Sequence, residues 1–241
     1  MAIELPDPVV KLLSFIGVTW PEVNEDKIRE LASHIRDFAG KMDDSHQNAT
    51  VTLKNLSEGY QGASYEAMIA TWAKMSNTHM SELQSACQAV AQALDLAADA
   101  VVGLKAGALV ELGVLAAAFV ADQAAAIFTF GLAEAGLPAL EATARTVMKK
   151  LVQDLEDHLV GQVVQAAIEP LEDSVAKAVS GLVYQETAAA LGQSSGGGTG
   201  TGILLHPDVM SSASASMRGH ADDIASHAQE LTDRISGMSF E

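Results

Sequence analysis

A four-residue break, Gly59-Tyr60-Gln61-Gly62, constrains this chain more than any other feature of its sequence. Apolar residues repeat in heptads on both sides of it, and each glycine costs a continuous helix about 1 kcal/mol relative to alanine. Two helices of about 30 to 38 residues with so short a connection must turn back on each other. The break therefore predicts an antiparallel helical hairpin, in which Gly59 and Gly62 permit positive φ and Tyr60 lies across the open end.

The apolar positions that support this hairpin recur with helical spacing. In the first helix, which begins after the N-cap residue Asn24, they are Ile28, Leu31, Ile35, Phe38, Met42, Ala49 and Leu56. In the second helix they are Ile69, Trp72, Ser76, His79, Leu83, Ala86, Val90, Ala93 and Ala97. We expect Trp72 in the core or at a partner interface, and His79 as a hydrogen-bonded residue of the seam.

A short apolar helix is predicted ahead of the hairpin. It runs from Pro8 to Ile16, with Asp7 as its N-cap and Gly17 as its stop. We expect Trp20, in the connector that follows, to plug the end of a helix pair, with a partner contact as the alternative. The first twenty residues lack a basic n-region, so they do not predict a general secretory signal.

The remaining chain is also helical in pattern, which makes the predicted fold class all-α. Residues 101–136 are alanine-rich and contain few charges, and we interpret them as a buried helix rather than a membrane span. A Gly/Ser-rich segment at 193–202 predicts a flexible linker. The predicted organisation is a helical domain over 1–192, this linker, and an amphipathic helix over 203–241.

Composition excludes several classes of function. The 241 residues carry a formal charge of −17, which argues against nucleic-acid binding and against adhesion to anionic lipid. Cys87 is the only cysteine, so no internal disulfide can form, and we expect it to be a small buried residue.

Catalytic and metal motifs are lacking in the sequence: there is no GxSxG, HExxH or GxxxxGK. His220 and His227 share a helix face but have no third ligand, and the acidic run Asp154, Glu156 and Asp157 reads as a solvated face. We therefore predict no enzyme activity, no cofactor and no metal, and a function in helix–helix binding. A small enzyme with an unrecognised site is the remote alternative.

The break resembles the Trp-x-Gly turn of the WXG superfamily of ESX (type VII) secretion substrates, with Tyr60 at the Trp position and Gly62 at the Gly position. The stretch IELPDPVVKLLSFIGVTWPEVNEDKIRELA is similar to the start of the CpnT-like N-terminal domain of actinobacterial polymorphic toxins. The later AAAIFTFGLAEAGLPALEATARTVMKKL resembles the alanine-rich second hairpin of the same family. Together these similarities cover residues 3–192.

The resemblance implies an elongated helical bundle, in which a WXG-type hairpin packs with the alanine-rich hairpin. It implies a protein that is cytoplasmic before export and is then secreted by the type VII route, alone or as the targeting module of a toxin. The implied partners are a small WXG-type helical protein, in a homo- or heterodimer, and the ESX secretion ATPase. Contact with membrane would occur only through that machinery, and Gly59, Tyr60 and Gly62 would form the export or partner turn.

Two features depart from the family pattern. The turn has Tyr60 instead of Trp, and none of the three tyrosines has an acidic residue four positions on, as the usual Tyr-x-x-x-Asp/Glu export signal requires. A partner chain would then supply that signal. The rival function is a membrane-active protein that inserts residues 101–136, and the position of Lys105, Glu111 and Asp122 distinguishes the two.

Overall fold

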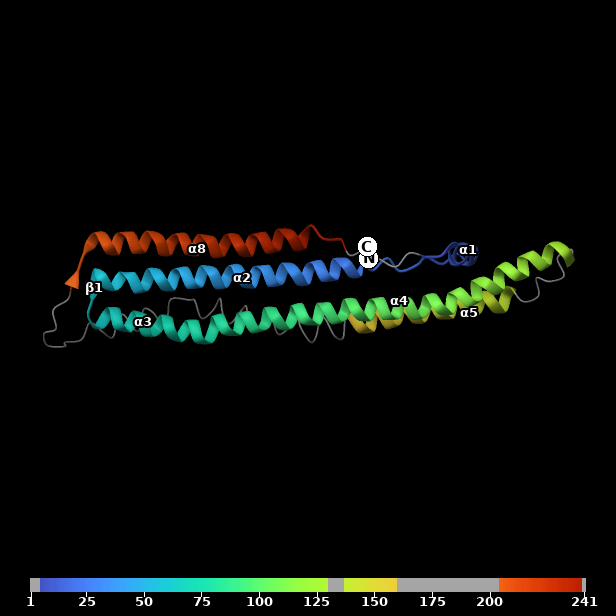
Figure 1. The fold of residues 1–241 in the computed structure, drawn as a ribbon, viewed down its shortest axis with the longest axis horizontal. Coiled ribbons are helices and arrows are strands. Elements are labelled where there is room, and N and C mark those ends of the chain that lie inside the picture. Colours follow the sequence, from blue (N-terminus) through green and yellow to red (C-terminus); the bar gives the residue numbers. More distant parts are fainter. Residues whose placement is uncertain (1–4, 130–136, 160–203, 240–241) are drawn as a thin grey trace. The chain divides into compact units, whose positions relative to one another are not determined.

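The computed structural model describes residues 5–129, 137–159 and 204–239, and these form the all-α fold that the sequence predicts. Its elements are shown in Figure 1. They are, in chain order, α1 (Asp7–Ile16), α2 (Glu25–Asn55), a 3₁₀ turn η1 (Leu56–Glu58), β1 (Tyr60–Gln61), α3 (Ala63–Met75), a π-helical turn η2 (Ser76–Met80), α4 (Ser81–Thr129), α5 (Leu137–His158), β2 (Leu204–Leu205) and α8 (Pro207–Ser236).

These elements make two compact units, and neither unit is a single stretch of chain. The described residues of the first unit are 5–30, 93–129, 137–159 and 239, and those of the second are 31–92 and 204–238. Both α2 and α4 run through the two units. The C-terminal helix, expected as a separate region after 1–192, thus shares a unit with the hairpin, while the predicted linker at 193–202 lies outside the described residues.

Helix α1 begins one residue earlier than the sequence pattern indicates. Its N-cap is Pro6, whose carbonyl accepts the N–H of Val9 at 2.9 Å, so the prediction of Asp7 as N-cap is wrong. Asp7 instead occupies the first turn, where its carboxylate faces the positive end of the helix dipole. Gly17 ends the helix at φ 65°, the left-handed conformation that glycine adopts without steric cost, as predicted.

The core of the first unit is aliphatic and joins α1 to α4 and α5. Its buried members are Val9, Leu12, Leu13, Ile16, Leu112, Ala116, Phe119, Ala144 and Met148. The rings of Phe15 and Phe119 lie 5.0 Å apart at its edge, and Arg145 donates to the carbonyl of Ile16, one of the last carbonyls of α1. Hydrophobic burial therefore holds α1 in place.

A buried ion pair joins α2 and α4 within this unit. Lys105 Nζ lies 3.2 Å from Glu25 Oε2, and also donates to the carbonyl of Val23. The side chains of Lys105 and Glu25 are 4% and 0% exposed. A charge that the sequence places in an apolar segment thus faces protein, where its partner compensates much of the desolvation.

Helix α4 is buried on one face only, which corrects the expectation of a buried helix over 101–136. Val101, Leu112 and Ala116 are fully buried, but Val110 and Val114 are 70% and 68% exposed. Residues 130–136, and the side chains from 124 onward, lie outside what the structure describes.

The second unit contains the turn and the adjoining parts of the predicted antiparallel hairpin, residues 31–92. Successive contacts pair Leu53 with Tyr65, Thr50 with Trp72 and His46 with Ser76, so the partners run in opposite directions along α2 and α3–η2. Of the apolar positions predicted in the first helix, Ile28, Ile35, Met42, Ala49 and Leu56 are buried, whereas Leu31 and Phe38 are half-buried. In the second helix, Leu83, Val90 and Ala97 are buried as expected, whereas the other described positions of the predicted seam are half-buried; these are Ile69, Trp72, Ser76, Ala86 and Ala93.

Candidate partner-binding site

The turn of the hairpin uses its two glycines in different ways. Gly62 is the N-cap of α3 at φ 129°, ψ 179°, a conformation that is strained for any residue with a side chain. Gly59 has φ −124°, which other residues adopt, so the prediction of a positive φ is confirmed at Gly62 and wrong at Gly59. A Cβ on Gly59 would lie 2.6–2.8 Å from the Cβ and both methyl groups of Val209, so this position needs glycine for space.

The turn is also half of a small antiparallel ladder, which the sequence analysis missed. Tyr60 pairs with Leu205 and Gln61 pairs with Leu204, and the N–H of His206 donates to the carbonyl of Gly59 at 2.7 Å. The available signal was the apolar Ile203-Leu204-Leu205 ahead of His206-Pro207, because a residue before proline favours an extended backbone. We call β2 together with α8, residues 204–236, the C-terminal arm.

Tyr60 is half-buried and packs edge-on against Tyr65, with ring centroids 6.0 Å apart. The Tyr65 hydroxyl donates to the carbonyl of Leu53 at 3.3 Å, one of the carbonyls that the end of α2 leaves without a helical partner. The side-chain amide of Gln61 donates to the carbonyl of Ser57 in the same way. The turn therefore combines a partly exposed aromatic with a well-bonded backbone.

Further along the hairpin, Trp72 stacks on His46. The two rings are 4.9 Å apart and nearly parallel, and the indole N–H donates to Thr50 Oγ1 at 2.9 Å. Burial lowers the pKa of His46, against a smaller opposite effect of Asp43. The structure thus places Trp72 at the seam between the two helices of the hairpin, half-buried.

The same histidine contacts a serine, because His46 Nε2 lies 2.5 Å from Ser76 Oγ. A Ser–His pair is part of a nucleophilic site, but such a site also needs a group that orients the base and free N–H donors for an oxyanion. Ser76 lies in η2, where helical bonding occupies the backbone N–H groups. The arrangement supports helix packing, and nothing around it assembles a catalytic centre in the described chain.

The other residues singled out from the sequence are dispersed. Trp20 lies in the first unit, half-buried against its core, with its indole Nε1 lacking a hydrogen-bond partner among the described residues. The side chain of His79 is outside what the structure describes. Cys87 is buried, which raises the pKa of its thiol to about 11 and leaves it unreactive as a nucleophile. The structure therefore brings only the turn residues Gly59, Tyr60 and Gly62 together.

Helix α8 runs antiparallel to α2 within the second unit. His220 contacts Thr52 at 3.1 Å, Lys41 contacts Glu230 at 2.5 Å, and Arg234 lies 3.9 Å from Asp37. Hydrogen bonds from Lys41 and Arg234 lower the pKa of the Glu230 carboxyl. His227 lines the same contact but has no set of metal ligands around it, and no group of three His, Cys, Asp or Glu suited to a metal occurs in the described part of the chain.

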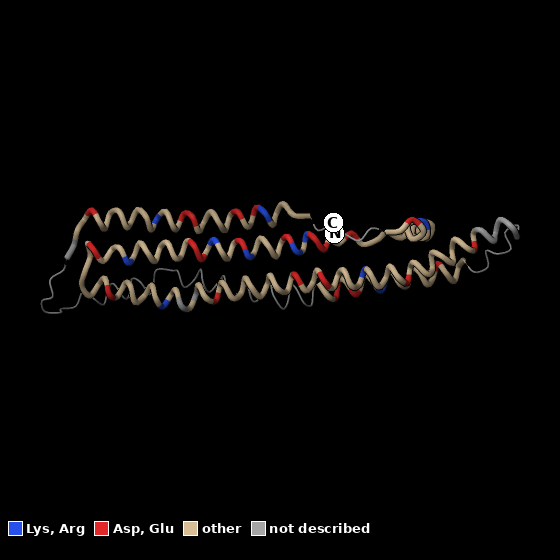
Figure 2. Tube along the Cα trace, viewed as in Figure 1, with Lys and Arg blue, Asp and Glu red and all other residues tan. Residues whose placement is uncertain are grey.

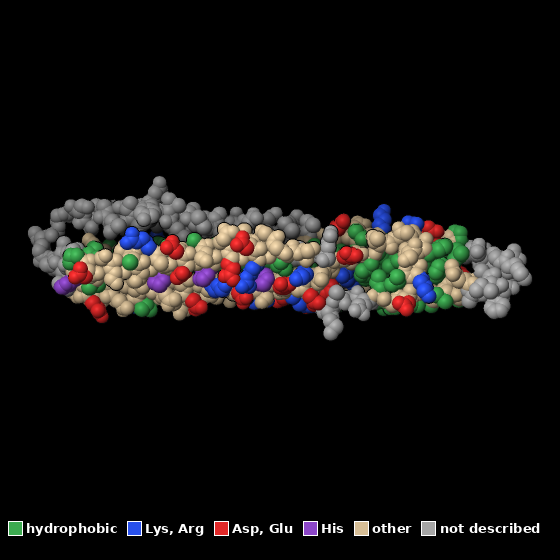
Figure 3. Space-filling model, turned by 90° about the horizontal axis from the view of Figure 1, so that it is seen from above, with side chains coloured by type: hydrophobic (Ala, Val, Ile, Leu, Met, Phe, Trp, Pro, Cys, Tyr) green, Lys and Arg blue, Asp and Glu red, His purple; other side chains and the backbone are tan. Residues whose placement is uncertain are grey.

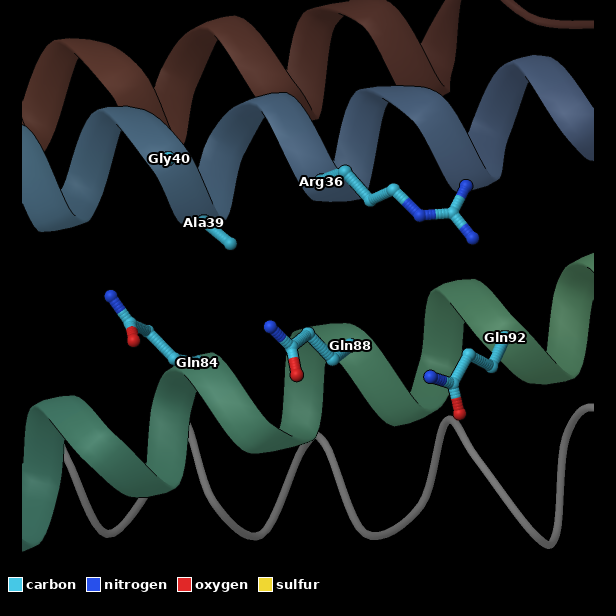
Figure 4. A pocket seen from close by; sticks show the side chains of 6 residues that line it. All are labelled: Arg36, Ala39, Gly40, Gln84, Gln88 and Gln92. Atoms are coloured by element: carbon cyan, nitrogen blue, oxygen red, sulfur yellow. The ribbon is translucent and has the colours of Figure 1, made fainter.

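A polar groove of about 540 Å³ lies between α2 and α4 in the second unit. Figure 4 shows Gln84, Gln88 and Gln92 along α4, across from Arg36 and the small residues Ala39 and Gly40 on α2. The glutamines are spaced by one helical turn, so their amides form a row that offers donors and acceptors but no net charge. This groove suits polar contacts of a protein partner better than a small apolar ligand.

Acidic residues predominate throughout the described helices. Figure 2 shows acidic residues along all of the long helices, with basic residues scattered singly among them. The 31 acidic residues outnumber the 14 basic ones, and Asp154, Glu156 and Asp157 lie on the partly or fully exposed side of α5. No basic stripe suited to nucleic acid occurs in the part that Figure 2 describes.

Among the described helices, residues Ser81–Gln123 of α4 are long and apolar enough to cross a membrane by length and composition. Only 28% of its most apolar stretch is buried. Lys105 in that segment is nevertheless paired with Glu25, and Glu111 is exposed. Of the three charges that the sequence analysis named, Lys105 thus faces protein, Glu111 is exposed and Asp122 is half-buried.

Comparison with known families gives one match, to the WXG100 like domain, over residues 4–151. No curated protein and no solved structure matches the chain. The matched region takes in α1, the hairpin with its turn, α4 and most of α5, whereas the C-terminal arm lies outside it. Because the match covers more than half of the chain, and the helical hairpin with its Gly62 turn has been described independently, the chain belongs to the WXG100-like domain family.

Proposed function

We propose that this protein is a substrate of the ESX (type VII) secretion pathway that works by helix–helix binding, without catalysis of its own. The observation that carries the proposal is the WXG100-like domain over residues 4–151, since that family is associated with type VII secretion. The hairpin, the half-buried Tyr60 at its turn and the acidic surface are consistent with a protein that other proteins recognise and bind.

Its proposed partners are helical. WXG100 proteins typically pair with helical partners, and we propose a small WXG-type protein as the one that binds this hairpin, as a homo- or heterodimer. The turn at Gly59, Tyr60 and Gly62 is the proposed recognition point for the secretion ATPase. The similarity of its first helix and second hairpin to the CpnT-like domain supports a role as the targeting module of a polymorphic toxin.

Export is tested by expressing the tagged full-length chain in an ESX-competent host and in the same strain without the secretion ATPase. We expect the protein in the culture supernatant of the first strain and only in the cells of the second. Equal export from both strains, or retention in both with the candidate partner co-expressed, would refute the proposal.

The turn is tested in the same assay with Tyr60→Ala and the matched control Tyr60→Phe. Loss of the ring should reduce export, whereas loss of the hydroxyl alone should not, because Tyr60 contacts Tyr65 through its ring. Wild-type export of the alanine variant would assign Tyr60 a purely structural part in the turn.

A second candidate function is insertion into membrane, which the apolar Ser81–Gln123 segment and the exposed Val110 and Val114 favour. Insertion would have to break the buried pair of Lys105 and Glu25, or bury a charge at a cost of at least about 2.5 kcal/mol. Leakage of neutral liposomes on addition of the purified chain at physiological pH would support insertion. An absence of leakage would favour the secretion-associated function alone.

A further inference from the structure

The C-terminal arm covers the hairpin without being built into its core. Helix α8 has 30 residues and none of them is fully buried. The half-buried positions lie along one face with a spacing of about three or four residues; they are Val209, Met210, Ala213, Met217, His220, Ile224, His227, Glu230 and Leu231. Figure 3 shows this region of the molecule with histidine, acidic and basic side chains at the surface, as expected for a helix that touches its neighbour through a narrow seam.

Beside this half-buried apolar seam, the charged contacts that hold α8 on α2 are exposed. The side chains of Lys41 and Glu230 are each 39% exposed, and those of Arg234 and Asp37 are 40% and 59% exposed. Ion pairs with this exposure contribute little to stability, because water competes with each partner and salt screens the charges.

The turn end of the arm fits closely on the hairpin. There β2 pairs with β1, and Val209 sits directly over Gly59. A two-stranded ladder of two residues per strand is too small to be stable by itself. The arm is therefore held by a close contact at the turn end, and along its length by a half-buried seam and exposed ion pairs, with no fully buried side chain in α8.

The face of α2 under the arm has a defined hydrogen-bonding character. Arg234 can only donate, so its 3.2 Å contact makes His34 Nδ1 an acceptor. Thr52 Oγ1 already donates to the carbonyl of Asn48, so His220 Nε2 must donate to Thr52. With Lys41 as a donor and the Asp37 carboxylate as an acceptor, α2 presents a fixed pattern to any helix that lies on it.

We propose that the C-terminal arm is a removable strap, and that the face of α2 it covers, formed by His34, Asp37, Phe38, Lys41 and Thr52, is a binding site for a partner helix that takes its place. The occupant is an amphipathic helix antiparallel to α2. It carries a carboxylate opposite Lys41, a cation opposite Asp37 and His34, and an apolar residue that fits over Gly59. The proposal rests on the proposed function only for the natural source of that helix.

The first measurement is hydrogen exchange on the full-length chain and its Val209→Asp variant. An aspartate in the first turn suits the α8 helix itself but places a charge against the Gly59 backbone. It therefore weakens the contact of residue 209 with Gly59 and not the helix. We expect amides of residues 204–236 to exchange about tenfold faster or more in the variant, with little change in α2 and α4. Unchanged amide exchange in the arm, or equal acceleration of exchange in the hairpin, would refute the proposal that the arm is removable.

The second measurement uses a labelled synthetic peptide of residues 204–238 as the probe helix. It should bind the Val209→Asp chain, bind wild type about tenfold less tightly or worse because the native arm competes, and lose binding when the peptide itself carries Val209→Asp. Failure to bind the variant chain, or equal binding to wild type, would show that the face is not a vacated helix site. These outcomes involve no export, so they stand or fall separately from the proposed function.

A compensating pair of substitutions tests the contact between Val209 and Gly59 directly. Gly59→Ala places a methyl group in the space that the Val209 side chain occupies, while the backbone at φ −124° accepts alanine. The amides of the arm should therefore again exchange faster. Adding Val209→Gly moves the free space to the other side of the contact, and slow exchange should return. Gly59→Ala without effect on the arm would show that Val209 does not seat there.

Discussion

Helix α1 and helix α8 are attached in opposite ways. The first has 10 residues, and four of them, Val9, Leu12, Leu13 and Ile16, are buried in an aliphatic core. The second has 30 residues and buries none. Burial of apolar side chains, and not helix length, therefore determines how firmly each element is held, because each fully buried aliphatic side chain contributes about 1.5–3 kcal/mol.

The charged contacts of the two units show the same contrast. Lys105 and Glu25 are 4% and 0% exposed, so neither can be removed without leaving the other in an apolar environment. Lys41 and Glu230 are each 39% exposed and can exchange their contact for water. The first unit is consequently expected to act as a fixed body, whereas we expect the arm of the second unit to detach from α2 more readily.

The largest expected effect comes from Lys105→Ala. It leaves Glu25 buried without its partner, which costs about 3–5 kcal/mol when a buried pair is broken. Denaturant unfolding followed by circular dichroism should show a clear loss of stability, and the matched control Lys41→Ala should show almost none. Similar losses for the two lysines would remove the contrast between the units.

A smaller but still large effect is expected for Leu12→Ala. Leu12 is fully buried, so its truncation should cost about 2–5 kcal/mol, whereas Ile224→Ala in the half-buried seam of α8 should cost about 1 kcal/mol or less. Thermal melting of the two variants measures the difference. An Ile224→Ala loss as large as that of Leu12→Ala would mean that α8 is part of a core.

Gly62→Val is expected to act within the second unit. Its φ of 129° is strained for a β-branched residue, so the variant should lose about 1–3 kcal/mol. Hydrogen exchange should accelerate in α3 and the turn and leave α1 unchanged. Acceleration of α1 to the same degree would show that the two units unfold together.

The smallest effect is a dependence on pH that arises from His46. Burial lowers its pKa in the folded chain, so the folded state binds fewer protons than the unfolded state near pH 6. The contribution of His46 is therefore complete above its unfolded pKa of about 6.5 and is lost as the pH falls from there through the folded pKa. The melting temperature of wild type should fall over this range more than that of His46→Phe, which keeps the stack on Trp72; parallel curves would assign the effect elsewhere.

The features that the sequence predicted correctly are governed by neighbouring residues. The heptad positions Ile35, Met42 and Ala49 are buried, Asn24 caps α2 by accepting from the N–H of Asp26 at 3.0 Å, and Gly62 has a positive φ. Each depends on a period of 3.5 to 3.6 residues, on a cap or on a turn, all of which are read within one or two helical turns.

The errors arose where a distant segment decides the outcome. Gly59 was assigned a positive φ, but its need for glycine comes from Val209 in α8. The turn pairs with Leu204 and Leu205, a contact that the sequence analysis did not predict. Helix α4 was expected to be buried, but the alanine-rich pattern of 101–136 carries no period that separates its buried face from its exposed one.

By itself, the sequence determined the all-α fold, the antiparallel hairpin, the conformation of Gly62 and the resemblance of the turn to a WXG motif, because helix periodicity and turn chemistry are local. Only the tertiary structure decided that Lys105 pairs with Glu25, 80 residues away, and that Lys41 meets Glu230 across 189 residues. No local pattern encodes such contacts, since they depend on which helix faces lie together once the chain has folded. The attachment of the C-terminal arm belongs to this second kind, and so does the proposal that it can be replaced.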